Sequence, residues 1–217
     1  MIDTKEYSAV IFDMDGVIVD NQKYHLLAWE QFCLKHSFQC VINTFSAQYF
    51  GKSNHEILNA LSGQILTSDI ALKLGEEKEE VYRKLYRNEI KPLNGLVELL
   101  KKLKSDNKLV AIASSAPISN IDFVLDSLSI RQYFDVIVDV SMVKNSKPDP
   151  EIYLKAADLL NVNPSKCLVF EDSHSGIKAA LSAGMNVIAI ATTHKKEELN
   201  PNLLKINDFE ELCSYTK

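Results

Sequence analysis

The sequence predicts an α/β fold: a parallel sheet with helices on both faces, plus an all-helical segment inserted after the first strand. Two observations support this prediction. A short apolar stretch, 9–12, is followed by helical patterns and no strand pattern throughout 17–89. From residue 92 onwards, short apolar segments alternate with amphipathic helical patterns. Because such alternation is typical of parallel sheets, we expect a core domain of 1–16 with 90–217 and a helical domain of 17–89.

The first expected strand is the apolar run 9–12, which is long enough to be buried. It ends on two carboxylates, Asp13 and Asp15, and Gly16 then allows the backbone to turn. Two carboxylates this close repel each other unless a cation lies between them. Mg²⁺ prefers oxygen ligands, so an acidic pair at a strand end suits this ion. A strand that simply ends on two solvated acids is the alternative.

The helical domain is expected to contain several helices, because apolar residues recur at helical spacing. In the first of them, Leu26, Trp29 and Cys33 lie on one face. The acidic cluster 76–80 is interpreted as a solvated first turn, which is favourable at a helix N-terminus. The expected helices are 22–36, 54–61, 68–74 and 76–90.

Strands and helices then alternate to the C-terminus. Prolines at 148 and 150 open one of these helices, and Gly184 stops another. The expected strands are 108–113, 136–138, 167–170, 187–190 and a short one at 203–206. The expected helices are centred on 96–103, 121–128, 152–160, 177–181 and 209–215.

Polar residues follow the expected strands where their carboxyl ends meet. These residues are Asp13 and Asp15, Ser114, and Glu171 with Asp172. Ligands of parallel α/β sheets bind beyond this edge, so residues far apart in the sequence are expected to converge there. The helical domain leaves the sheet at the same edge, and we expect it to act as a lid with hinges near 16–20 and 88–92.

Composition excludes several classes of protein. The chain has 217 residues, 46% of them hydrophobic, and a formal charge of −5, which argues against a nucleic-acid binder. Its four cysteines have no Cys-x-x-Cys spacing and are interpreted as reduced thiols of a cytoplasmic protein. We expect no signal segment at the N-terminus and no membrane span, because no run approaches roughly 18 apolar residues.

The chemistry expected at the sheet edge is transfer of a phosphoryl group. Asp13 is the candidate nucleophile, and Asp15 is the candidate acid and base. Ser114 is a candidate donor to a phosphoryl oxygen, and Lys147 a candidate for neutralising its charge. Glu171 and Asp172 add oxygen ligands for Mg²⁺ beside Asp13 and Asp15. Taken singly, Ser114 is better explained as a helix cap and Lys147 as an exposed loop lysine, and Glu171–Ser173 as a cap of the following helix is the alternative there.

Together these segments resemble the four motifs of the haloacid dehalogenase-like superfamily, over the whole chain. The motifs are Asp-Met-Asp-Gly-Val at 13–17, Ser114, Lys147 in Lys-Pro-Asp-Pro, and Glu-Asp-Ser-x-x-Gly at 171–176. The resemblance implies a Rossmann-like core with a helical cap, Mg²⁺, and a phosphatase that forms an aspartyl phosphate. The cap is similar to that of the subfamily that includes phosphoglycolate phosphatase, sugar-phosphate phosphatases and β-phosphoglucomutase.

The resemblance also implies residues that contact the substrate. Gly51 and Lys52 match a cap loop that faces the active site, although Lys52 is equally explained as an exposed lysine. His25 lies in a stretch similar to β-phosphoglucomutase, where this histidine is near the active site, and a structural role is equally expected. The backbone at Ser115 and Ala116 is expected to bind phosphoryl oxygens.

Three functions remain open at this stage. A phosphatase admits water to the aspartyl phosphate, whereas a mutase of the β-phosphoglucomutase type needs extra donors for a second phosphate. That resemblance predicts an arginine in the cap loop and a Ser-Lys pair after Ser114, but the chain has Asn54, Ala116 and Pro117. We therefore favour a phosphatase acting on a small phosphate monoester, such as a sugar phosphate, as a monomer or weak homodimer. A non-enzymatic phosphate-binding or signalling module is the third function.

Overall fold

The computed structural model describes residues 6–40, 44–45 and 53–213, and the chain divides into two compact units. The core unit contains the chain up to Asp20 and from Lys91 onwards, and the helical unit is Asn21–Ile90. The unit boundaries lie within four residues of the domain boundaries expected from the sequence at 17 and 89.

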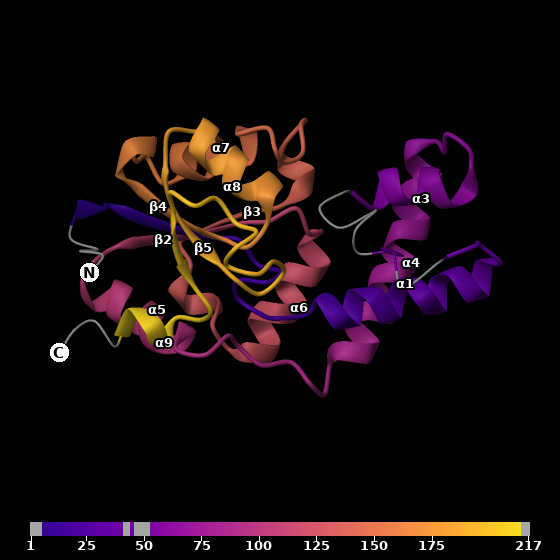
Figure 1. The fold of residues 1–217 in the computed structure, drawn as a ribbon, viewed down its shortest axis with the longest axis horizontal. Helices are drawn as coiled ribbons and strands as arrows, with labels where there is room; N and C mark the ends of the chain where they lie inside the picture. The colour runs from indigo at the N-terminus through magenta and orange to yellow at the C-terminus, as the bar shows by residue number, and fades with distance from the viewer. Residues whose placement is uncertain (1–5, 41–43, 46–52, 214–217) are drawn as a thin grey trace. The chain divides into compact units, whose positions relative to one another are not determined.

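The core unit is built on a single six-stranded sheet in which neighbouring strands are parallel (Figure 1). The strand order is β3-β2-β1-β4-β5-β6, so the chain first builds the sheet outwards from β1 on one side and then on the other. This confirms the parallel α/β fold predicted from the sequence. The strands are β1 Ala9–Phe12, β2 Leu109–Ala113, β3 Val136–Val138, β4 Cys167–Glu171, β5 Asn186–Ile190 and β6 Leu204–Ile206.

Strand β1 lies in the middle of the sheet, with all four of its residues buried. Phe12, its last residue, is in register with Ile112 of β2 and Phe170 of β4. Because the three strands are parallel and in register, the chain leaves them at the same edge of the sheet. The residues that follow each strand are therefore brought together.

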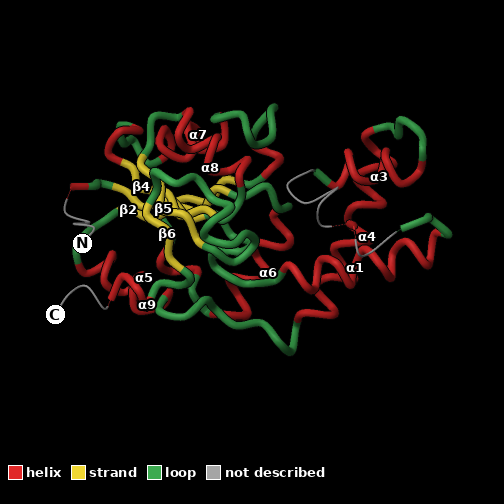
Figure 2. Tube along the Cα trace, viewed as in Figure 1, coloured by secondary structure: helices red, strands yellow, loops and turns green. Residues whose placement is uncertain are grey.

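Helices cover both faces of this sheet (Figure 2). On one face, α7 and α8 pack with apolar residues of the central strands, including Ile11 and Val169. On the other, the rings of Phe12, Phe170 and Phe209 pack with centroids 5.0–5.9 Å apart. The helices of this unit are α5 Leu96–Ser105, α6 Ile118–Leu128, α7 Glu151–Leu159, α8 His174–Ser182 and α9 Glu210–Cys213, with 3₁₀ turns η2 Arg131–Tyr133, η3 Val140–Met142 and η4 Pro164–Lys166.

The helical unit contains α1 Gln22–His36, α3 Asn54–Ser62 and α4 Ser68–Tyr86. Its apolar core gathers aromatic residues of α1, including Trp29 and Phe32, against Ile57 and Leu58 of α3. A capping box begins α3: the Ser53 side chain accepts from the Glu56 N–H, and the Glu56 side chain accepts from the Ser53 N–H.

Two sequence predictions about α4 were wrong. The segments 68–74 and 76–90 are one continuous helix that passes through Gly75 and ends at Tyr86. A glycine inside a helix costs only about 1 kcal/mol relative to alanine, so it need not end one that packing supports. The cluster 76–80 is therefore mid-helix rather than a solvated first turn, and Lys78 and Glu79 are buried as an ion pair of 2.9 Å.

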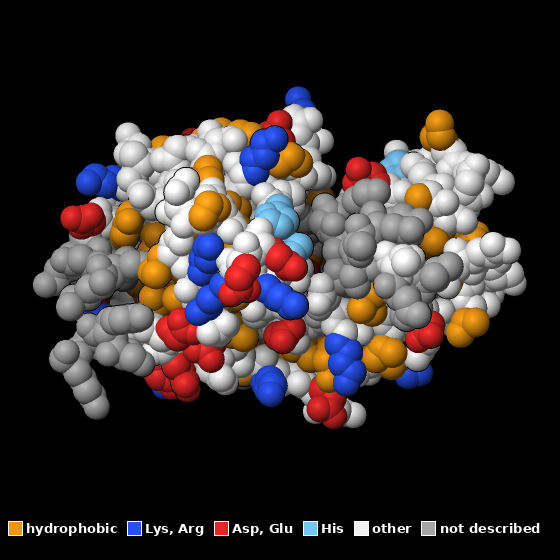
Figure 3. Space-filling view, viewed as in Figure 1, with side chains coloured by type: hydrophobic (Ala, Val, Ile, Leu, Met, Phe, Trp, Pro, Cys, Tyr) orange, Lys and Arg blue, Asp and Glu red, His pale blue; other side chains and the backbone are white. Residues whose placement is uncertain are grey.

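The surface carries charges of both signs. On the face shown in Figure 3, acidic and basic side chains are interspersed. Some charged side chains form ion pairs, such as the exposed pair Lys102–Asp106 and the partly exposed pair Lys196–Glu211. Pairs in solvent each contribute roughly 0–1 kcal/mol, so stability rests on the apolar interior of each unit. Within the described part of the chain, the helices lack the combination of length and apolarity that crossing a membrane requires.

Candidate active site

Asp13 directly follows β1, so it lies near the middle of the sheet edge where the carboxyl ends of the strands meet. Its N–H donates to the Phe170 carbonyl over 3.0 Å, which continues the ladder to β4 by one residue. The side chain is buried. The next residues turn sharply: Gly16 has a φ of +77°, and its N–H donates to the Val19 carbonyl. Asp15 lies in this turn and is half-buried.

Lys147 reaches the same point from the loop before α7, and it is buried rather than exposed. Its Nζ donates to Asp13 Oδ1 at 2.9 Å, to Glu171 Oε1 at 2.8 Å and to the Ala113 carbonyl at 3.1 Å. The ammonium also lies 4.8 Å from the centre of the Tyr153 ring. Lys147 therefore links the ends of β1, β2 and β4.

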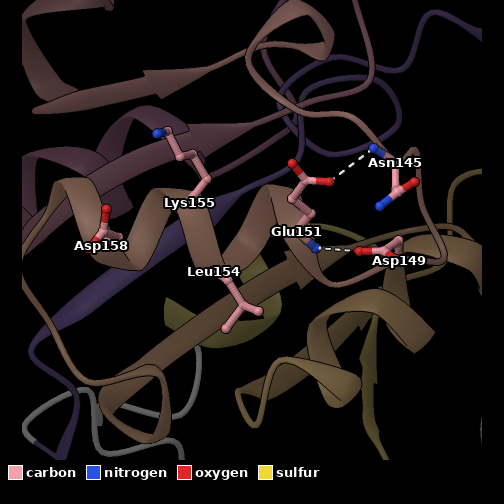
Figure 4. Close-up of a pocket in the computed structure, with 6 residues that line it drawn as sticks. All are labelled: Asn145, Asp149, Glu151, Leu154, Lys155 and Asp158. Carbon is pink, nitrogen blue, oxygen red and sulfur yellow. Dashed lines mark hydrogen bonds between the residues drawn. The ribbon is translucent and has the colours of Figure 1, made fainter.

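The loop that carries Lys147 is held from its outer side by Glu151, the first residue of α7 (Figure 4). The Glu151 carboxylate accepts the N–H groups of Lys144 and Asn145 at 2.9 Å each. The Glu151 N–H in turn donates to Asp149 Oδ1 at 3.0 Å. These bonds fix the loop on both sides of Lys147, which reduces the entropy lost when its ammonium is held inside.

Glu171 is the last residue of β4, and both of its carboxylate oxygens accept two hydrogen bonds. Oε1 accepts from Lys147 and from the Tyr153 hydroxyl at 3.0 Å, whereas Oε2 accepts from the N–H and hydroxyl of Ser173. A carboxylate has about four acceptor positions, so this one is fully used. The side chain packs directly against Gly176 of α8, where an added Cβ would lie 1.5 Å from Oε1.

Asp172 completes a group of three buried carboxylates with Asp13 and Glu171. One oxygen of each lies within 4.8 Å of the others, an arrangement that could hold a metal ion. Asp15, also expected from the sequence as a ligand, is not part of this side-chain group. Three hard oxygen donors with no histidine or thiolate among them match the preference of Mg²⁺ or a similar cation.

The pKa shifts reflect three acids sharing one lysine. Burial, and then the charges of neighbouring carboxylates, raises the pKa of Asp13 to about 7, against the opposing effect of Lys147. Burial and the charges of Glu171 and Asp13 raise the pKa of Asp172 well above its usual value. For Glu171, burial raises the pKa, but Lys147 and the hydrogen bonds from Ser173 together outweigh it and lower the pKa. Ionising all three acids beside a single lysine would leave an excess of negative charge, which adds to burial in raising two of the pKa values and which a divalent cation would offset.

Ser114 follows β2 at the same edge of the sheet and is buried. Its N–H donates to the Val138 carbonyl at 3.0 Å, and its hydroxyl oxygen accepts the Ala116 N–H at 3.2 Å. It does not cap α6, whose N-cap position is Pro117. Ser115 is exposed and Ala116 is buried.

The structure describes some of the helical-unit residues expected near the substrate, and others lie outside the described residues. His25 stacks on Tyr82 with ring centres 3.9 Å apart, and its Nδ1 lies 2.8 Å from Lys78 Nζ. The structure thus gives His25 partners inside that unit. Asn54, which stands where a mutase arginine was expected, donates to Glu79 Oε1 at 2.8 Å. Gly51 and Lys52 lie outside the described residues.

Sequence reasoning missed three residues that contact the site. Tyr153 donates to Glu171, Thr192 donates to the Gly16 carbonyl at 2.6 Å, and Thr193 donates to Asp172 Oδ2. The two threonines follow an apolar strand, as Asp13 and Ser114 do, so the same positional signal was available for them. Tyr153 had no such signal, because its place on α7 is that of an ordinary core residue.

Comparisons with known proteins agree with this geometry. Residues 10–190 match the family model described as haloacid dehalogenase-like hydrolase. The chain is 36% identical to phosphorylated carbohydrates phosphatase of Thermotoga maritima, covering 83% of each protein. It is 34% identical to β-phosphoglucomutase of Bacillus subtilis, covering 84% of this chain and 82% of that one. A solved family IA hydrolase of Entamoeba histolytica has a TM-score of 0.86 and 31% identity, with 94% of each chain covered.

Proposed function

The chain belongs to the haloacid dehalogenase-like hydrolase family, and we propose that it is a Mg²⁺-dependent phosphatase that hydrolyses the phosphate monoester of a small metabolite. A sugar phosphate is the substrate class favoured, because a similar protein is named as a phosphatase of phosphorylated carbohydrates. The observation that carries the proposal is Lys147 donating to Asp13 in a buried group of three carboxylates. This contact supports the proposal because the candidate nucleophile then lies beside the candidate site for positive charge.

Asp13 performs the first step in this proposal. One of its oxygens attacks phosphorus while the bond between phosphorus and the ester oxygen breaks, and the leaving alcohol takes a proton from Asp15. The product bound to the chain is an aspartyl phosphate. Splitting hydrolysis into two steps matters because phosphomonoester hydrolysis is among the slowest uncatalysed reactions, with enzymatic accelerations of up to ~10²¹.

Water completes the reaction. Asp15, now deprotonated, takes a proton from a water molecule whose oxygen attacks phosphorus, and the bond to Asp13 breaks to release inorganic phosphate. Lys147 and the hydroxyl of Ser114 hold the phosphoryl oxygens, together with the backbone at Ser115 and Ala116. The charge of Lys147 is already fixed by its contacts with Asp13, Glu171 and the Ala113 carbonyl, which favours the transition state.

Family members generally use a divalent metal ion, and the buried carboxylates fit one. We propose Mg²⁺, held by Asp13 and Asp172, with Glu171 as the third acid of the group. When bound, the ion supplies positive charge that polarises the phosphoryl group. Glu171 contributes chiefly through its bonds to Lys147 and Tyr153, because its oxygens already accept four hydrogen bonds.

The helical unit is proposed to act as a cap that excludes bulk water, with Lys52 and His25 as candidate contacts to the substrate. A lid of this kind favours small phosphates over proteins or nucleic acids. We expect a cytoplasmic enzyme that is a monomer or weak homodimer.

A phosphomutase is the second candidate, and similarity to β-phosphoglucomutase of Bacillus subtilis is the observation that favours it. The donors for a second phosphate argue against it. The residues after Ser115 are alanine and proline, which offer no cation or hydroxyl. Asn54 has Glu79 as its partner within the helical unit.

The test is phosphate release from a panel of sugar phosphates with Mg²⁺, with isomerisation of β-glucose 1-phosphate measured in parallel. Hydrolysis is expected for the wild type and none for Asp13→Asn, and chelation of the metal is expected to stop it. Isomerisation without net release of phosphate would show a mutase instead. A fully active Asp13→Asn variant would exclude the covalent route.

A further inference from the structure

The loop after β5 contacts two of the acidic loops through consecutive threonine side chains. Thr192 Oγ1 donates to the Gly16 carbonyl, in the turn that follows β1. Thr193 Oγ1 donates to Asp172 Oδ2, just after β4. Since β5 is the neighbour of β4 in the sheet, this loop leaves at the same edge as Asp172. It therefore joins the two turns that carry Asp13 and Asp172.

Asp172 Oδ2 is held from a second side by Gly16. A Cβ atom at Gly16 would lie 1.9 Å from this oxygen, so the carboxylate packs directly against the glycine backbone. The bond from Thr192 fixes the peptide of that glycine. Oδ2 is thus confined between Gly16 and the Thr193 hydroxyl, which leaves Oδ1 as the oxygen available to a ligand.

The donors at the three carboxylates differ in charge. The ammonium of Lys147 donates to Asp13 and Glu171. Asp172 is buried, with 4% of its surface exposed, and the donor to its carboxylate is the neutral hydroxyl of Thr193. A hydroxyl fixes the orientation of a carboxylate without cancelling its charge, whereas an ammonium does both. Asp172 is therefore held in place with its negative charge still available to a cation.

We propose that Thr193 is a positioning residue for the divalent cation, holding Asp172 Oδ2 so that Oδ1 faces the shared carboxylate group. This inference rests on the proposed function, which places the cation there. Removing a hydrogen-bond partner of a metal ligand typically costs about 10–100-fold in metal affinity. Thr193→Val replaces the hydroxyl by a methyl group of similar size, and we expect a loss in that range.

The experiment measures Mn²⁺ binding to the full chain by electron paramagnetic resonance, because Mn²⁺ prefers the same oxygen ligands as Mg²⁺. Thr193→Val and Thr193→Ala are expected to bind about 10-fold more weakly or worse. Thr193→Ser keeps the hydroxyl and is expected to restore the affinity. Thr67→Val is the matched control, because Thr67 is exposed and its side chain makes no capping bond at the start of α4.

The inference would be overturned if a folded Thr193→Val or Thr193→Ala variant bound Mn²⁺ as tightly as the wild type. It would also be overturned if Thr193→Ser bound Mn²⁺ as weakly as Thr193→Val and Thr193→Ala. Phosphate release measured on the same samples separates this result from the proposed function. Weak binding in Thr193→Val with no hydrolysis by the wild type would remove the proposed function and keep the positioning role. Hydrolysis by the wild type with unchanged Mn²⁺ binding in Thr193→Val would remove the positioning role alone. A wild type that binds no Mn²⁺ would overturn both.

Discussion

Replacing Lys147 by methionine tests whether this lysine holds the acidic group together in the absence of metal. The ammonium donates to two buried carboxylates, Asp13 and Glu171, and to one carbonyl. Methionine keeps most of the side-chain volume but leaves the carboxylates without their cation. Removing one partner of a buried ion pair costs about 3–5 kcal/mol, because the remaining charge is buried without compensation. For a chain of this size, that corresponds to a fall in Tm on the order of 10 °C.

The assay is thermal and urea unfolding in EDTA, with Lys102→Met as the matched control. Lys102 pairs with Asp106 at 2.8 Å, but its side chain is 56% exposed. Its replacement is expected to change stability by less than about 1 kcal/mol. If Lys147→Met unfolded as the control does, the argument that Lys147 offsets the buried acids would be refuted.

Two further measurements separate charge from packing at Lys147. Glu171→Gln added to Lys147→Met removes one uncompensated charge, so the double variant is expected to regain part of the lost stability. Mg²⁺ is expected to stabilise Lys147→Met more than the wild type, because it supplies the positive charge that the substitution removes. A loss caused by packing alone would respond to neither change.

Two other predictions concern the turn after β1 and the start of α8. Asp15→Asn is expected to slow turnover by about 10²–10⁴-fold, because it removes the proton donor and acceptor; near-normal rates in steady-state assays would place that role elsewhere. Gly176→Ala is expected to destabilise the chain, because its Cβ would displace Glu171. Gly75→Ala is the contrasting variant, because its Cβ would lie at an ordinary contact distance of 3.5 Å from Asn54. We expect it to raise the free energy of unfolding, measured in urea, by about 1 kcal/mol. The opposite order of stability would show that Glu171 moves without cost.

The parts of the site that follow strands could be predicted from the sequence. Apolar runs located β1, β2 and β4, and parallel strands necessarily bring their carboxyl ends to one edge. The convergence of Asp13, Ser114 and Glu171 follows from that rule alone. Lys147 lies outside a strand, and its place came from the resemblance of its motif rather than from periodicity. The structure brings it within 2.9 Å of Asp13.

Other features depend on tertiary contacts that no local pattern records. Lys78 and Glu79 sit in a run of charges typical of an exposed turn, yet packing of α4 buries both. Two helices were expected, one on either side of Gly75, but α4 continues through it. Tyr153 donates to Glu171 from a position that helical periodicity assigns to the apolar core. In each case the deciding partner comes from another element of the chain.

The order of the strands explains why this edge holds a site at all. The chain goes from β1 outwards to β2 and β3, then crosses to the other side for β4, β5 and β6. The turns after β1 and β4 therefore diverge, and the crevice between diverging turns is where parallel sheets bind ligands.

Asp13 comes from one turn and Asp172 from the other. Their repulsion would push these turns apart, whereas Lys147, which donates to Asp13 and Glu171, draws them together, and a cation held by Asp13 and Asp172 would add to this. The β5 loop adds neutral bonds to both, through Thr192 to Gly16 and through Thr193 to Asp172. Such bonds can keep the turns in place while the cation is absent, so that binding it requires little rearrangement.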